Sequence, residues 1–311
     1  MTSPAPARPP VERRGARAVP AEILRQVKRI ELRTRGLVNS RFTGEYHSVF
    51  KGMGMEFAEV REYQPGDEVR TIDWNVSARM RRLFVKRFVE ERELTVMLIV
   101  DCSGSSRGGA GARDKQGIAA ELAAVMALSA TRNNDRVGLL LHSDRVEHVV
   151  PPRKGRRHAL RLVRDVLAYP STSRGTDLGA AFDYAGRLLT HRSIVFVVSD
   201  FVSPALEKPL TRLAQRHDVV ALVLDDPAER TLPDAGVARL RDAETGTLVE
   251  VDTSDPKVRA RYAALVRAEQ QARQGLLRRL AVDEVVVPLE EGYVEPLLRF
   301  FRTRETRARR R

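Results

Sequence analysis

The stretch LTVMLIVDCSGSS, residues 94–106, decides the fold of this chain. Its first part is an unbroken apolar run that ends in Asp101, which is typical of a strand buried on both faces of a parallel sheet. Ser103 and Ser105 follow at alternate positions, so an extended loop would direct their side chains the same way as Asp101. We therefore expect a buried strand whose solvent-facing carboxyl end carries three oxygen-bearing side chains.

Further apolar runs recur downstream and alternate with segments of helical spacing. The runs SIVFVV (193–198), VVALVL (219–224) and VDEVVV (282–287) predict strands, and residues 257–279 predict a long helix. The stretch ARLRDAETGTLVEVD (238–252) predicts a hairpin. Apolar strands separated by helices indicate an α/β fold, in which a doubly wound, mostly parallel sheet is flanked by helices on both faces.

Composition and charge divide the chain into four expected regions. Residues 1–35 hold nine Lys or Arg against three Glu, and residues 299–311 hold seven Arg against one Glu, so the excess of the net charge of +13 lies near the two ends. We expect nucleic acid to bind only non-specifically, through these basic ends. The regions are a disordered basic tail (1–20), an N-terminal helix with a small β-containing leader (21–93), the α/β domain (94–298) and a basic C-terminal tail (299–311).

Composition also bears on the compartment. The single cysteine, Cys102, allows no intramolecular disulfide, which fits a reducing environment. No apolar run approaches the ~18 residues that a membrane helix needs. We therefore expect a cytoplasmic protein with no membrane insertion.

Polar side chains follow several of the predicted strands. Ligands bind at the carboxyl ends of the strands in open α/β sheets, so these residues are expected to meet at one edge. Oxygen ligands without nitrogen or sulfur suit Mg²⁺, with Mn²⁺ or Ca²⁺ as alternatives. The predicted metal-binding residues are Asp101, Ser103, Ser105, Thr176 and Asp200.

The order D-x-S-x-S, a distant Thr and a distant Asp resembles the metal-ion-dependent adhesion site of von Willebrand factor A-type domains. The resemblance implies that Ser103, Ser105 and Thr176 bind the ion directly, while Asp101 and Asp200 bind it mainly through water. It also implies that a Glu or Asp of a protein partner completes the coordination shell.

Residues 52–106, which begin GMGMEFAEVREYQPGDEVRTIDWN, resemble the signature of a bacterial family, domain of unknown function 58. Members of this family join such a leader to an A-type domain and are commonly encoded beside MoxR-type AAA+ ATPases. The resemblance implies a non-enzymatic adaptor or co-chaperone, which works with such an ATPase on a client protein.

Other functions remain open on the residues alone. A metal-dependent hydrolase could use the same ion, although no general base or phosphate clamp is evident nearby. A serine hydrolase would need His142, the best placed of the six histidines, as its base. The glycine run 108–111 lacks the G-K-S/T of a phosphate-binding loop. In the leader, we expect Trp74 to pack in a core and the surrounding charges to pair.

Overall fold

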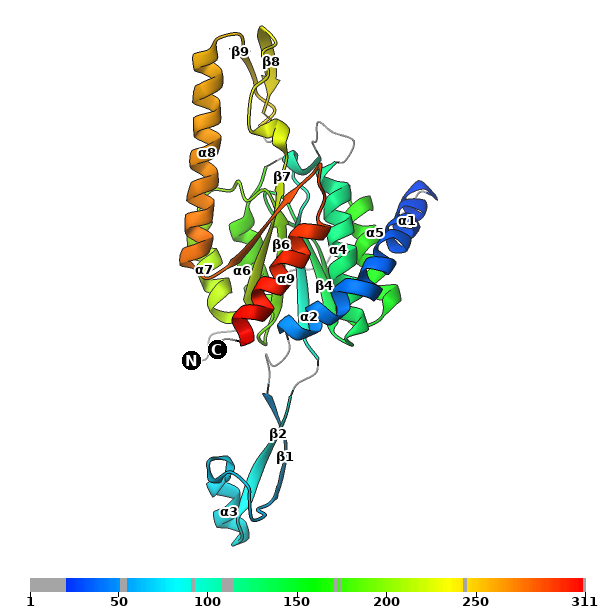
Figure 1. Cartoon of the computed structure of the whole chain (residues 1–311), viewed down its shortest axis with the longest axis vertical. Helices are drawn as coiled ribbons and strands as arrows, with labels where there is room; N and C mark the ends of the chain where they lie inside the picture. The colour runs from blue at the N-terminus through cyan, green and yellow to red at the C-terminus, as the bar shows by residue number, and fades with distance from the viewer. Residues whose placement is uncertain are drawn as a thin grey trace, which may run out of the picture.

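A central six-stranded sheet organises the chain in the computed structural model (Figure 1). The strand order is β10-β7-β6-β3-β4-β5, and every neighbouring pair is parallel except β4–β5. The α/β class with a mostly parallel sheet is therefore confirmed. The strands are β3 (Thr95–Asp101), β4 (Arg136–His142), β5 (Val146–Arg153), β6 (Ile194–Ser199), β7 (Asp218–Asp225) and β10 (Asp283–Pro288).

The structure describes residues 21–50, 55–90, 93–107, 114–170, 173, 175–242 and 245–309. The expected disordered tail (1–20) and the glycine run 108–111 lie outside these ranges. None of the described helices is long and apolar enough to cross a membrane.

Successive strand residues enter opposite hydrophobic cores, which explains why the apolar runs are unbroken. In β3, Val96, Leu98 and Val100 belong to one core, whereas Met97 and Ile99 belong to the other. The first core lies under α1 (Ala21–Leu37), α2 (Thr43–Phe50), α4 (Lys115–Arg132), α5 (Arg156–Ala168) and α9 (Val294–Arg309). The second lies under α6 (Leu178–Leu188), α7 (Glu207–Arg216) and the end of α8 (Pro256–Arg279).

Two of the expected flanking regions contribute helices to the first core. Residues 21–50 form α1, a π-helical turn η1 (Val38–Phe42) and α2, and these helices pack on the sheet domain rather than in a separate leader. At the other end, the boundary after residue 298 falls inside α9, whose Phe300 and Phe301 are buried.

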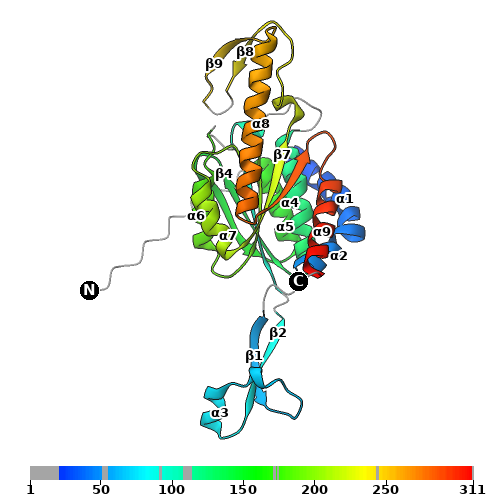
Figure 2. The same cartoon turned by 60° about the vertical axis from the view of Figure 1, so that its left-hand side comes forward.

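Two projections leave opposite ends of the strands of the sheet (Figures 1 and 2). One consists of the antiparallel pair β1 (Met55–Glu62) and β2 (Phe84–Glu90) with α3 (Trp74–Met80), and it precedes the amino end of β3. The other consists of the antiparallel hairpin β8 (Val237–Arg241) and β9 (Leu248–Asp252) with the long helix α8. The second projection rises from the carboxyl edge, where the predicted site lies.

The expectation that Trp74 packs in a core is wrong. Its side chain is 64% exposed at the first turn of α3, because two strands and one short helix enclose too little volume to bury it. The charges do pair, since both terminal nitrogens of Arg61 donate to the Asp67 carboxylate at 2.6 and 2.8 Å. Asp73 caps α3 by accepting from the backbone N–H groups of Asn75 and Val76.

A buried carboxyl group joins α2 to the sheet. Asp135 accepts hydrogen bonds from the Leu94 N–H (2.9 Å) and the Tyr46 hydroxyl (3.1 Å). Burial nevertheless raises the pKa of Asp135 to about 6, because the hydrogen bonds only partly offset desolvation. The folded protein therefore holds a proton there that the unfolded chain releases near pH 4.

The proton on Asp135 predicts a pH-dependent stability. The contribution of this proton to the free energy of unfolding is fully present below about pH 4 and is lost as the pH rises through 6. Asp135→Asn has no group that titrates there. Its free energy of unfolding, relative to that of the wild type, is therefore expected to be about 2 kcal/mol higher at pH 7.5 than at pH 4.5. Urea unfolding at both pH values measures this difference. Asp183→Asn, on the exposed pair with Arg212, is the control. An Asp135→Asn effect that is equal at both pH values would contradict the assignment.

Candidate metal-binding site

Asp101 ends β3 at the carboxyl edge of the sheet, and both of its carboxylate oxygens are held in place. Oδ1 accepts from the Ser103 N–H at 2.8 Å, and Oδ2 accepts from the Ser199 hydroxyl at 3.0 Å. The side chain is not solvent-facing as expected, since Asp101 is only 5% exposed. Ser199, the last residue of β6, was not assigned a role from the sequence. Its hydroxyl also accepts from the Phe201 N–H, so it orients both Asp101 and the loop that follows β6.

The serine hydroxyls of the D-x-S-x-S stretch meet beside Asp101. The hydroxyl oxygens of Ser103 and Ser105 lie 3.0 Å apart, and that of Ser106 lies 3.4 Å from Ser103. Ser103 is fully buried, whereas Ser105 is partly open to the surface. The turn therefore brings together three of the five predicted ligands.

Thr176 lies on the loop before α6, at the same edge. The neighbouring Asp177 N–H donates to the Ser143 carbonyl just beyond β4 (2.7 Å), and the Leu178 N–H donates to the Ser203 hydroxyl beyond β6 (3.1 Å). These bonds tether the loop to two strand ends. The Thr176 side chain is only 6% exposed, yet its hydroxyl has no hydrogen-bond partner among the residues that the structure describes.

Asp200 follows β6 directly and faces a buried lysine. Its Oδ1 accepts from the Val202 N–H at 3.1 Å, while its Oδ2 lies 3.5 Å from Lys115 Nζ. Lys115 is the first residue of α4 and is only 1% exposed. Its ammonium also donates to both carboxylate oxygens of Glu229, at 2.7 and 2.9 Å.

Burial alone would lower the pKa of Lys115, but the carboxylates of Asp200 and Glu229 outweigh it and raise the pKa above its ordinary value. The ammonium is therefore charged at neutral pH. Sequence reasoning missed both Lys115 and Glu229. The only indication in the sequence was a lysine at the start of an apolar helix.

The ligand set suits a hard cation and no softer one. In the described part of the chain, no group of three or more His, Cys, Asp or Glu residues is placed so that it could hold a metal ion, so a site at this edge depends on hydroxyl ligands as well as carboxylates. The unpartnered hydroxyl of Thr176 is consistent with an additional ligand at this edge, because buried hydroxyls normally have a partner. The residues therefore fit a Mg²⁺-type ion.

His142 does not form a catalytic pair with the serines. It ends β4 beside Asp101 in the sheet and is fully buried. Its Nδ1 lies 3.4 Å from the Ser143 carbonyl, and its Nε2 has no partner among the described residues. A serine nucleophile would need one of these nitrogens within hydrogen-bond reach, so the geometry does not favour a serine hydrolase.

Comparison with known families agrees with the family resemblance of residues 52–106. Residues 59–272 match the family described as protein of unknown function DUF58. The chain belongs to this family. Uncharacterised proteins of Mycobacterium tuberculosis and Mycobacterium bovis are each 30% identical to it over 305 residues, which cover 97% of this chain and 96% of theirs.

Two solved structures are similar to this DUF58 member at low identity. The conserved hypothetical protein BatB from Bacteroides thetaiotaomicron covers 69% of this chain and 99% of its own, with 15% identity and a TM-score of 0.47. The SpRpn10 VWA domain covers 44% of this chain and 77% of its own, with 19% identity and a TM-score of 0.33.

A groove of about 940 Å³ extends the candidate site of this DUF58 chain toward α8. Ser105, Asp200 and Glu229 are part of its lining. Arg273 of α8 donates to the Asp200 carbonyl at 3.4 Å, which links the far wall to the site. The rest of the wall is mixed, with apolar, basic and acidic side chains that include Val202, Leu276, Arg230, Arg279, Glu207 and Glu269.

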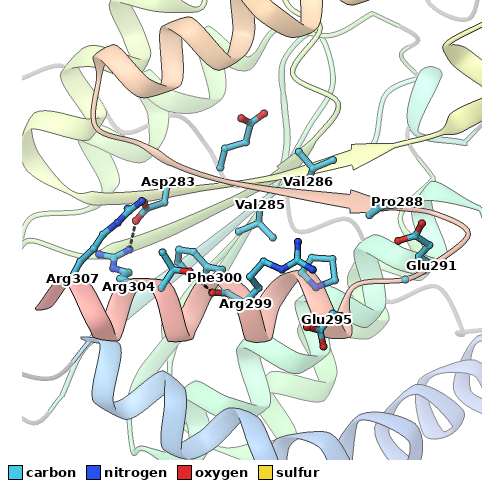
Figure 3. Close-up of a pocket in the computed structure, with 14 residues that line it drawn as sticks. Asp283, Val285, Val286, Pro288, Glu291, Glu295, Arg299, Phe300, Arg304 and Arg307 are labelled. Atoms are coloured by element: carbon cyan, nitrogen blue, oxygen red, sulfur yellow. Dashed lines mark hydrogen bonds and ion pairs between the residues drawn. The ribbon is translucent and has the colours of Figure 1, made fainter. Parts of the chain in front are cut away.

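A second hollow, of about 410 Å³, lies between β10 and α9 (Figure 3). Asp283 pairs there with Arg304 at 3.2 Å and with Arg307 at 3.0 Å. The Arg304 guanidinium also lies over the Phe50 ring, 4.8 Å from its centroid. These contacts hold α9 on the sheet, so the residues of this hollow serve the fold.

Proposed function

We propose that the carboxyl edge at Asp101 binds a Mg²⁺-type ion and uses it to dock a carboxylate of a protein partner. The unpartnered, buried hydroxyl of Thr176 carries the proposal, since it lies at the edge where Asp101 and the serine turn meet. Ser103, Ser105 and Thr176 would hold the ion directly, with Asp101 and Asp200 acting mainly through water.

The donor set explains why such a site would recruit a carboxylate. Neutral hydroxyls transfer little charge to a hard cation, so the ion remains electron-poor and attracts an anionic oxygen from outside. The groove beside Ser105 and Asp200 gives the residues that flank this carboxylate a surface along α8. A protein-interaction module is the function that these features support.

The family resemblance suggests the partner. A MoxR-type AAA+ ATPase is the first candidate, and the chain would act as its cytoplasmic adaptor or co-chaperone toward a client protein. A metal-dependent hydrolase would need a cationic clamp for its substrate. Lys115, the charged group beside Asp200, is instead engaged by two carboxylates, which disfavours that alternative.

Isothermal titration with Mg²⁺ and Mn²⁺, using the full chain, tests the ion. We expect micromolar to millimolar affinity in the wild type, and Thr176→Val should weaken it about tenfold or more. Because this hydroxyl has no partner among the described residues, the same change should not lower the melting temperature in EDTA. Thr34→Val, which removes a buried hydroxyl of α1, is the control and should leave ion affinity unchanged.

The partner is tested by gel filtration with the MoxR-type ATPase of the same organism. EDTA should release the complex and Mg²⁺ should restore it. A wild type that binds neither ion would overturn the proposal. A complex that survives EDTA would show that docking lies elsewhere on the chain.

A further inference from the structure

Lys115 stands in an unfavourable place for a lysine. Its ammonium is buried, and it belongs to the first turn of α4, where the helix dipole disfavours a positive charge. A buried ammonium is retained only where anionic partners compensate for its lost hydration. Glu229 and Asp200 are those partners, so the position is held by charge rather than by packing.

The two partners of Lys115 differ in distance and in setting. The Glu229 oxygens lie 2.7 and 2.9 Å from the ammonium, while the nearer Asp200 oxygen is at 3.5 Å. Glu229 belongs to the turn η4 (Pro227–Glu229) after β7, and its side chain is 51% exposed in the groove. Asp200 is instead one of the predicted ligands of the ion. Glu229 therefore draws the ammonium toward itself and away from Asp200.

We infer that Lys115 is a built-in cation that limits how tightly the site binds a divalent ion, and that Glu229 sets the strength of this limit. The inference rests on the proposed function of the same site. A positive charge beside a ligand carboxylate repels an incoming cation and competes for that carboxylate. With the effective dielectric constant found near a protein surface, one charge a few ångströms from the ion changes the affinity for that ion about tenfold or more.

This arrangement also connects the ion to the groove. The Tyr262 hydroxyl of α8 donates to the Glu229 carbonyl at 2.9 Å, so the turn that carries Glu229 is attached to the groove wall. A segment lying along α8 reaches the exposed carboxylate of Glu229 before it reaches Lys115. Contacts made in the groove thus act on the charge balance at Asp200.

Calorimetric titration of Mn²⁺ into the full-length chain tests the inference. We expect Lys115→Met to tighten binding about tenfold or more, because it removes the charge and keeps the length of the side chain. Glu229→Gln is expected to weaken binding severalfold, because Lys115 then has Asp200 as its sole carboxylate partner. Lys154→Met, which removes a surface lysine paired with Glu93, is the control and should bind as the wild type does.

Melting curves in EDTA establish that each variant is folded. Should Lys115→Met not fold, the double variant Lys115→Met/Glu229→Gln removes both charges, and it is expected to bind Mn²⁺ more tightly than Glu229→Gln alone. Equal affinities of these two variants would overturn the inference.

The outcomes separate this inference from the proposed function. Unchanged or weaker binding by folded Lys115→Met overturns the role of Lys115, while ion binding by the wild type still stands. Binding by Lys115→Met but not by the wild type supports the inference and overturns the proposed function. Binding by no variant overturns both.

Discussion

Asp101→Asn is expected to abolish measurable divalent-ion binding. Removing one buried negative charge from the site lowers the affinity for the ion by about a hundredfold or more. The carboxylate is the anionic group at the centre of the site, next to the serine turn and oriented by Ser199. The amide oxygen can still accept from the Ser103 N–H, and the amide N–H₂ can donate to the Ser199 hydroxyl. The substitution therefore removes the charge, retains the bond from the Ser103 N–H and reverses the direction of the bond to Ser199.

Asparagine is a sharper test than alanine at this position. Alanine would leave the buried Ser103 N–H and the proton of the buried Ser199 hydroxyl without their acceptor, at about 1–3 kcal/mol each, so lost binding could reflect a distorted turn. Calorimetry with Mn²⁺ and co-elution with the ATPase are the measurements. Asp226→Asn is the matched control, since this buried carboxylate follows β7 at the same edge but caps a turn. Retained ion binding in Asp101→Asn would remove Asp101 from the site.

Phe50→Ala is expected to cause the largest loss of stability, about 3–5 kcal/mol in the free energy of unfolding. Phe50 ends α2 and is fully buried. Its ring packs edge-to-face on Phe196 of β6 and Phe301 of α9, with centroids 6.0 and 6.3 Å away. Removing it opens a cavity where the N-terminal helices, the central sheet and the last helix meet.

Chemical denaturation monitored by circular dichroism measures this loss. Trp74→Ala is the control, because it removes a larger aromatic side chain from an exposed position and should change stability by no more than about 0.5 kcal/mol. Equal effects of the two variants would show that residues 21–50 do not belong to the main core.

The sequence predicts the sheet well because its strands carry their own signal. The runs that became β3, β6 and β7 are apolar at nearly every position, as two-sided burial requires. The hairpin β8–β9 was likewise predicted from its turn residues, and Gly246 adopts a φ of +73° there.

The elements that sequence reasoning missed are those in which tertiary contacts override local preference. The α2 segment TGEYHSVF contains Thr, Gly and Val, which are poor helix formers, and its helix depends on the burial of Tyr46 and Phe50. The C-terminal Arg residues suggested a solvated tail, although Arg304 lies against the rings of Phe50 and Phe300. A cationic side chain can thus belong to a core through its contacts with aromatic faces.

The candidate site was predictable only in part for a similar reason. Asp101, Ser103 and Ser105 lie in one short stretch, so their spacing could be interpreted directly. Lys115 and Glu229 are 114 positions apart, and neither belongs to a recognisable motif. Their contact arises from the folding of α4 and β7 onto the same sheet edge, which no local pattern encodes.

The opposite placement of the two projections has a mechanical consequence. The β1–β2–α3 projection connects to the amino end of β3, whereas the β8–β9 hairpin and α8 continue from the carboxyl end of β7. Tension applied between the two tips would therefore pull β3 and β7 in opposite directions along their length, with β6 between them. The ladders β3–β6 and β6–β7 would bear this load in shear, with all of their hydrogen bonds sharing it at once. The sheet would thus transmit a pull between the two tips before its strands separate.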